Sequence, residues 1–69
     1  MAAKWVSRDT VSCKDKAARI WRVSYGFWIV ELYQKSGVVA KRVGQDYAQN
    51  RRVARNIARF FVEGGERRG

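Results

Sequence analysis

The chain of 69 residues has no histidine, no proline and only one cysteine, Cys13. Without histidine or a second cysteine, a zinc site within one chain and a disulfide framework are both excluded, and a reducing, cytoplasmic compartment is expected. No apolar run reaches the length of a signal peptide or a membrane-spanning helix, so no membrane contact is expected. These absences predict a soluble domain that needs neither metal nor disulfide.

Acidic residues are scarce as well: six Asp and Glu stand against fifteen Lys and Arg, a net charge of +9. No two carboxylates have the spacing of a catalytic pair, no histidine can serve as a general base, and no glycine-rich phosphate loop occurs. We therefore expect no enzyme activity and no cofactor. Ten of the basic residues are Arg, whose planar guanidinium suits phosphate and guanine edges. This balance favours nucleic acid as the partner, with an acidic protein as the alternative.

The most informative stretch is FWIVELY, residues 27–33, because both of its alternating faces are apolar. A two-residue turn at Tyr25-Gly26 pairs this strand with the preceding one. A loop over residues 34–37 leads into a third strand; a three-residue loop ending at Gly37 is the alternative, but it buries Arg42. The predicted core face contains Trp21, Val23, Trp28, Val30, Leu32, Val39 and Val43. The opposite face contains Ile20, Arg22, Ser24, Phe27, Ile29, Glu31, Tyr33, Val38, Ala40 and Arg42.

The last part of the chain has the pattern of an amphipathic helix over about residues 46–63. Asp46 is the expected N-cap, with Gln49 completing a capping box, and Gly64-Gly65 is the expected stop. We expect the apolar stripe of this helix to close the core against the face that contains Trp28. The stripe consists of Val53, Ala54, Ile57, Ala58 and Phe61.

Together these elements predict an α+β domain of β-β-β-α order, a three-stranded antiparallel sheet packed on one C-terminal helix. Residues 1–18 are an N-terminal arm that either stays loose or adds a strand, residues 19–63 are the domain, and residues 64–69 are a basic tail. The sheet face away from the helix is too apolar to remain bare. The arm, a second copy of the chain in a homodimer, and DNA are the three candidate covers.

The run WIVEL (residues 28–32), the turn with Gly37, and Val43-Gly44 before an Ala-containing helix resemble two kinds of DNA-binding domain. These are the plant ethylene-response-factor domains and the amino-terminal arm-binding domains of phage-type tyrosine recombinases. The resemblance covers residues 19–61 and implies a sheet face that reads the major groove. It places Glu31 at the base-contacting Glu of a Trp-x-x-Glu motif and Arg42 at a DNA-facing position. The first hairpin is shorter than in the plant domains.

On the sheet, the expected contacts divide by role. Contacts with bases are expected from Arg22, Glu31 and Arg42. Contacts with the DNA backbone are expected from Arg19 and Lys41. Exposed rings also suit single strands, on which bases stack, whereas Trp21 and Trp28 are assigned to packing. The residues assigned to stacking or to a protein interface are Phe27, Ile29, Tyr33 and Val38.

The helix offers a rival surface for phosphate. Arg51, Arg55 and Arg59 follow one another at steps of four, with Arg52 beside them and no acidic partner at i,i+4 spacing. Such a stripe of like charges favours an anionic partner. Because helix and sheet face opposite ways, only one of them is expected to grip a short duplex.

From the sequence we expect a small basic nucleic-acid-binding protein, with double-stranded DNA favoured over RNA, that acts as a regulator or recombination accessory. The alternative is a protein-interaction module, such as a phage- or plasmid-type inhibitor of a host protein. In that case apolar side chains of the sheet are the interface anchors.

Overall fold

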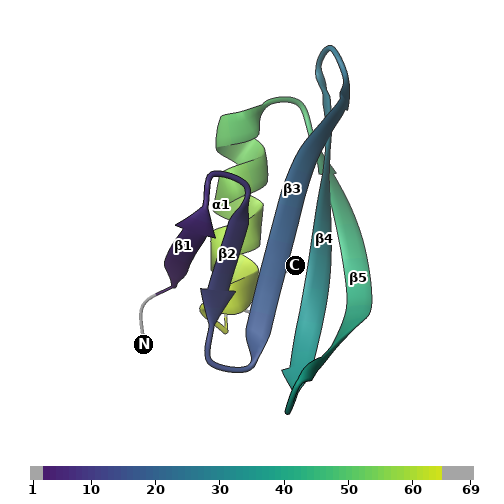
Figure 1. The fold of residues 1–69 in the computed structure, drawn as a ribbon. Helices are drawn as coiled ribbons and strands as arrows, with labels where there is room; N and C mark the ends of the chain where they lie inside the picture. Colours follow the sequence, from purple (N-terminus) through teal and green to yellow (C-terminus); the bar gives the residue numbers. More distant parts are fainter. Residues whose placement is uncertain (1–2, 65–69) are drawn as a thin grey trace.

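The computed structural model describes residues 3–64. Five antiparallel strands form one sheet, in which each strand pairs with the next along the chain, and a helix follows (Figure 1). The elements are β1 (Lys4–Ser7), β2 (Thr10–Cys13), β3 (Lys16–Ser24), β4 (Phe27–Ser36), β5 (Val39–Ala48) and α1 (Arg51–Val62). The helix lies across one side of the sheet, mainly over β3 and β4. In this part of the chain, no helix is long and apolar enough to cross a membrane.

The prediction of a three-stranded sheet was wrong, because the N-terminal residues form two further strands. β2 pairs with β3, and Val11 of β2 is completely buried. The described part of the predicted arm, residues 3–18, therefore widens the sheet at its edge and does not lie over its face. The boundary between residues 18 and 19 falls inside β3. Each of these two strands has only four residues, the shortest length at which alternation indicates a strand.

A β-bulge at Val23 changes how β3 pairs with β4. The predicted turn at Tyr25-Gly26 is confirmed, and Gly26 has the positive φ, +75°, that glycine adopts without strain. Past the bulge, Ile20 lies opposite Val30, where unbroken pairing would place Trp21. Because side chains alternate along a strand, this one-residue shift moves the earlier β3 side chains to the other face. The predicted faces of the first strand were therefore wrong.

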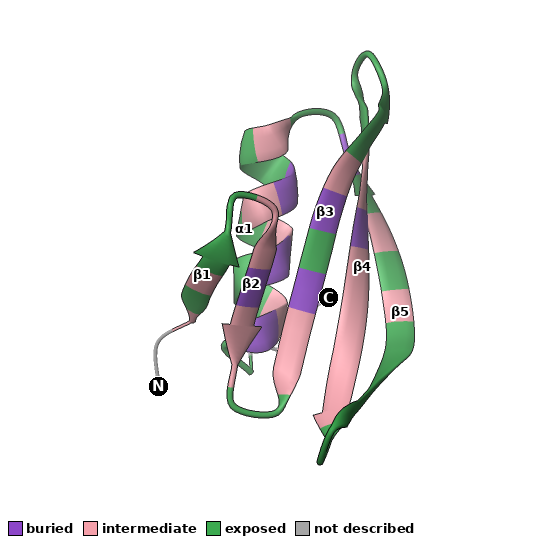
Figure 2. Ribbon diagram, viewed as in Figure 1, coloured by how far each residue is buried: buried purple, intermediate pink, exposed green. Residues whose placement is uncertain are grey.

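The core consists of small and β-branched side chains between α1 and the sheet (Figure 2). Ile20 is buried here, although the sequence placed it on the opposite face, and Val23, predicted as core, is 50% exposed at the bulge. Alanines of both the helix and the sheet belong to this core, and Trp5 and Trp28 pack at its border, half-buried. The buried residues are Val11, Ala18, Ile20, Val30, Ala48, Ala54, Ala58 and Val62.

The hairpin between β4 and β5 is tighter than either predicted loop. Ser36 lies opposite Val39, so only Gly37 and Val38 form the turn. Gly37 has a φ of +64°, in the left-handed region that two-residue hairpin turns use. The strands therefore run closer to the turn than the sequence indicated, and Val39 is 62% exposed, outside the core.

A second bulge interrupts β5 at Val43. Leu32 of β4 lies opposite Gly44, whereas the next residue, Tyr33, lies opposite Arg42. Val43 is 54% exposed and does not join the core as predicted. Gly44 leaves room for its neighbour, because a Cβ at this position would lie 3.4 Å from Leu32 Cδ1.

The helix begins later than predicted, because β5 continues to Ala48 and takes up Asp46. Asn50 is the N-cap, and its Oδ1 accepts a hydrogen bond of 3.0 Å from the backbone N–H of Val53. The predicted stop at Gly64 is confirmed by its φ of +83°. Gly65 and the basic tail lie outside the described residues.

The apolar stripe of α1 is mostly as predicted. Ala54 and Ala58 are completely buried, and Ile57 and Phe61 pack at the border of the core. Val53 is the exception: it is 40% exposed, at the outer side of the helix.

Candidate nucleic-acid interface

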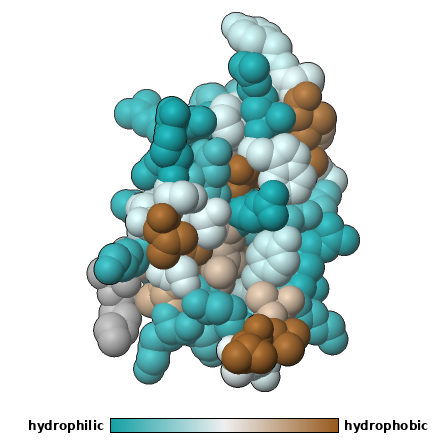
Figure 3. Space-filling model, viewed as in Figure 1, coloured by the Kyte–Doolittle hydropathy of each residue, from teal (hydrophilic) through white to brown (hydrophobic). Residues whose placement is uncertain are grey.

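The side of the sheet that faces away from α1 is not covered by any element of residues 3–64. We call this side the open face, and Figure 3 shows hydrophilic, weakly polar and apolar side chains mixed over the molecule in the same view. Strand alternation and pairing assign it to residues of all five strands. Its members are Lys4, Ser7, Thr10, Ser12, Ala17, Arg19, Trp21, Ser24, Phe27, Ile29, Glu31, Tyr33, Lys35, Ala40, Arg42, Gln45 and Tyr47.

One end of the open face is aromatic. Trp21, Ile29 and Tyr47 lie side by side across β3, β4 and β5. Phe27 stacks on Tyr47, with ring centroids 5.4 Å apart and planes inclined by 13°. The two rings remain 40% and 53% exposed. The prediction that Trp21 packs in the core was wrong, because the bulge turns its side chain outward.

The middle of the open face carries a hydrogen-bonded polar network around Glu31. Its carboxylate accepts a 2.5 Å bond from the Tyr33 hydroxyl and a 3.1 Å bond from Arg42 Nη1. Arg42 Nη1 also donates to Gln45, and Gln45 in turn donates to the hydroxyl of Tyr47. Glu31 thus neutralises Arg42 and orders the network.

The two titrating groups of this network shift in opposite directions. The hydrogen bond from Tyr33, and after it the neighbouring Arg42, lower the pKa of Glu31 from its ordinary value of 4.5. The same hydrogen bond raises the pKa of Tyr33 above 10.0. The network therefore favours an ionised carboxylate and a neutral phenol, the forms in which Glu31 accepts and Tyr33 donates.

Removing the Tyr33 hydroxyl tests this network. We expect Tyr33→Phe to raise the pKa of Glu31 toward 4.5 and to lower the free energy of unfolding near neutral pH by about 1 kcal/mol. A carboxyl group whose pKa is lower in the folded than in the unfolded protein stabilises the fold at pH values above its unfolded-state pKa. This stabilisation is lost as the pH falls through the folded-state pKa. The variant should therefore differ from wild type above about pH 4.5 and converge with it in acid.

Carboxyl NMR titration and denaturant unfolding between about pH 7 and about pH 3 provide the measurement. Tyr25→Phe is the matched control, because Tyr25 is 96% exposed at the hairpin tip. An equal Glu31 pKa in both variants would contradict the assigned cause.

Other cations stand beside the aromatic and polar groups of the open face. The guanidinium of Arg19 lies 5.4 Å from the Trp21 ring centroid, a cation–π arrangement. Lys35 Nζ donates a 2.5 Å hydrogen bond to Ser12 Oγ. Arg19 is exposed and has no carboxylate within ion-pair distance among the described residues. Its charge is therefore available to an anion.

Two arginines of the helix stripe instead hold α1 to the β1–β2 hairpin. Arg51 Nη2 lies 3.6 Å from Asp9 Oδ1, and its guanidinium lies 5.2 Å from the centroid of Trp28. Arg55 lies 3.9 Å from the centroid of Trp5 and donates to a backbone carbonyl of the hairpin turn. Arg51 thus has an acidic partner that i,i+4 spacing did not reveal, because Asp9 is distant in the sequence.

The remaining predicted contact residues are scattered. Arg22 lies on the helix side of the sheet, in a shallow groove with Trp28 and Arg51, so its assignment to the open face was wrong. Lys41 is opposite Gln34, also away from the open face. Val38 is at the β4–β5 turn and Arg59 is exposed on α1. The open face therefore unites Arg19, Glu31, Arg42, Phe27, Ile29 and Tyr33 from the predicted set.

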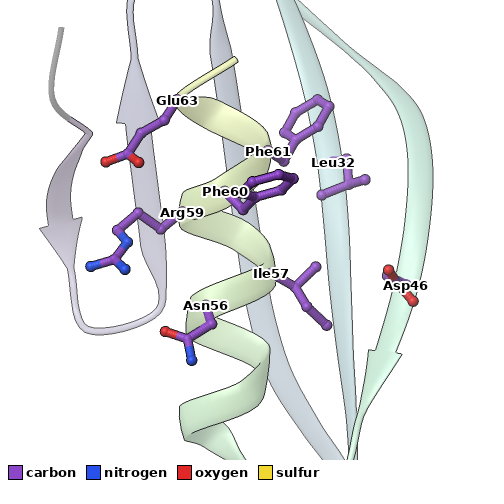
Figure 4. A pocket seen from close by; sticks show the side chains of 8 residues that line it. All are labelled: Leu32, Asp46, Asn56, Ile57, Arg59, Phe60, Phe61 and Glu63. Carbon is purple, nitrogen blue, oxygen red and sulfur yellow. The ribbon is translucent and has the colours of Figure 1, made fainter. Parts of the chain in front are cut away.

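Sequence reasoning missed an apolar groove of about 400 Å³ where α1 borders β4 and β5 (Figure 4). Leu32, Ile57 and Phe61 form its floor, and Phe60, 45% exposed, lies at its edge. The groove exists because α1 covers the β3 half of the sheet more fully than the β5 half. Its polar rim is Asp46, Asn56, Arg59 and Glu63.

No protein family, no curated protein and no solved structure matches this chain. The resemblance to ethylene-response-factor and recombinase arm-binding domains therefore stays a prediction, and the sheet has two strands more than it implied. The geometry of the open face is accordingly the basis for a functional proposal.

Proposed function

We propose that the protein binds nucleic acid through the open face of its sheet. The observation that carries this proposal is that exposed cations and exposed rings share a face that α1 leaves uncovered: Arg19 lies beside Trp21, and Phe27 stacks on Tyr47. Four cations belong to this face, Lys4, Arg19, Lys35 and Arg42, against a single carboxylate, Glu31. A surplus of this sign attracts a phosphate backbone, and rings can meet bases.

The internal role of Glu31 supports phosphate attraction more than direct reading of a base. Both oxygens of its carboxylate are occupied, one by Tyr33 and the other by Arg42. A base edge would have to displace one of these donors. Arg42, with 56% of its side chain exposed, can still present part of its guanidinium to a phosphate.

The helix is the weaker candidate surface. Arg51 and Arg55 already stack on tryptophans and contact the β1–β2 hairpin, which leaves Arg52 and Arg59 as its exposed arginines. We therefore assign the main contact to the sheet. A role as a regulator or recombination accessory in a reducing, cytoplasmic compartment remains part of the proposal.

Paired charge removals on the two sides of the molecule test the proposal. The open-face variant carries Arg19→Gln and Lys35→Gln, and the control carries Arg52→Gln and Arg59→Gln, with the same change in net charge. Binding of a labelled oligonucleotide is followed by anisotropy between about 50 and about 200 mM salt. We expect the open-face variant to lose about 1.4 to about 1.8 from the slope of log K against log salt, and the control much less.

If the helix control lost more of this slope than the open-face variant, the binding site would lie on α1 and the assignment to the sheet would be wrong. If wild type binds neither single-stranded nor duplex oligonucleotide at the lower salt, the proposal fails altogether. The open face would then be read as a protein interface with Phe27 and Ile29 among its anchors.

A further inference from the structure

The open face is arranged in rows that cross the strands. The aromatic row contains Trp21, Ile29 and Tyr47, and the next row, two residues further along each strand, contains Arg19, Glu31 and Gln45. Two residues of a strand span about 6.8 Å. An apolar, largely aromatic row is thus followed along the strand direction by a polar row, and Arg19 joins the two rows through its contact with Trp21.

The width of the sheet argues against a duplex ligand. Five strands with four spacings of about 4.8 Å make a surface about 19 Å across. The major groove is about 12 Å wide and admits a two-stranded ribbon or a helix. The two extra strands therefore remove the geometry on which the prediction of major-groove reading depended.

The exposed rings argue for unpaired bases. Phe27 and Tyr47 keep about half of their surfaces open although their rings stack on each other at the end of the β4–β5 pair. In a duplex, bases are stacked on one another and offer only their edges. In a single strand, bases stack on aromatic side chains, and Arg planes add cation–π contacts.

We infer that the open face binds single-stranded nucleic acid, with bases stacked on Trp21, Phe27 and Tyr47 and the backbone held by Arg19 and Arg42. This inference rests on the proposed function and specifies its ligand. Stacking is tolerant of sequence, since every base has a π-face. The protein should therefore prefer single strands to duplex and should discriminate little among sequences.

The first experiment compares a mixed-sequence single strand of about 16 nucleotides with its duplex and with an abasic strand of equal charge. We expect the single strand to bind at least about tenfold more tightly than either. Trp21 is the only one of the three tryptophans on the open face. Stacking should quench the intrinsic fluorescence, and Trp21→Phe should remove most of this quenching.

The second experiment uses matched ring deletions. Phe27→Ala removes a ring that is 40% exposed on the open face, and Phe60→Ala removes one that is 45% exposed on α1. We expect Phe27→Ala to weaken single-strand binding by about fivefold or more and Phe60→Ala to leave it unchanged.

The outcomes separate this inference from the proposed function. Tighter binding of duplex, or equal binding of the abasic strand together with no effect of Phe27→Ala, would overturn the inference but leave nucleic-acid binding intact. Absence of binding to all three ligands would overturn both.

Discussion

A chain that begins at Arg19 should fail to fold. This truncation removes β1 and β2 together with the first part of β3, including Ala18 and the completely buried Val11. Burial of one valine contributes about 1.5 kcal/mol or more. A core of this size provides only about 3 to 5 kcal/mol in total. Far-UV circular dichroism and denaturant unfolding should show no cooperative transition. A cooperative transition would establish residues 19–63 as a domain by themselves.

Point variants make the same test without changing chain length. Val11→Ala should lower the free energy of unfolding by about 2 kcal/mol, because it leaves a cavity under α1. Val6→Ala is the matched control in the neighbouring strand, since Val6 is 60% exposed, and it should cost less than about 0.5 kcal/mol. If Val11→Ala lowered the free energy of unfolding as little as Val6→Ala does, Val11 would not be a core residue.

The pairing register of β3 predicts which of its apolar side chains matter for stability. We expect Ile20→Ala to lower the free energy of unfolding by about 3 kcal/mol and Val23→Ala to lower it by less than about 1 kcal/mol. Ile20 is 1% exposed in the core, whereas Val23 is 50% exposed at the bulge. Without the bulge, the two residues would exchange faces and the order of the losses would reverse. Urea unfolding of both variants decides between the registers.

The helix provides an internal reference for this comparison. Val53→Ala changes a third β-branched side chain, which is 40% exposed on α1, and should resemble Val23→Ala. If Ile20→Ala were as mild as both, the bulge at Val23 would be ruled out.

The sequence predicted those features that depend on local chemistry. The Tyr25-Gly26 turn, the helix stripe around Ala54 and Ala58, and the glycine stop are all set by neighbours a few residues apart. The open face was also found in part, because Phe27 and Ile29 belong to β4, whose faces do not change. The class, a sheet packed on one C-terminal helix, followed from these elements.

The bulges were not predictable, because the pattern around them is ambiguous. Ile20 and Trp21 are adjacent and both apolar, so shifting the register by one residue replaces one apolar side chain with another. Hydrophobic alternation fixes register only where one face is polar. The contact of Arg51 with Asp9 was hidden for another reason: it joins α1 to a hairpin that the sequence did not reveal.

The bulge at Val43 has a consequence for self-association. β5 is an edge strand of ten residues, long enough to serve as a template for another chain. The bulge divides its pairing at Val43, and Lys41 and Arg42 put two charges beside the break. Irregular, charged edges resist the addition of a foreign strand. The kink that turned Val43 out of the core thus also protects the longer edge of the sheet against aggregation.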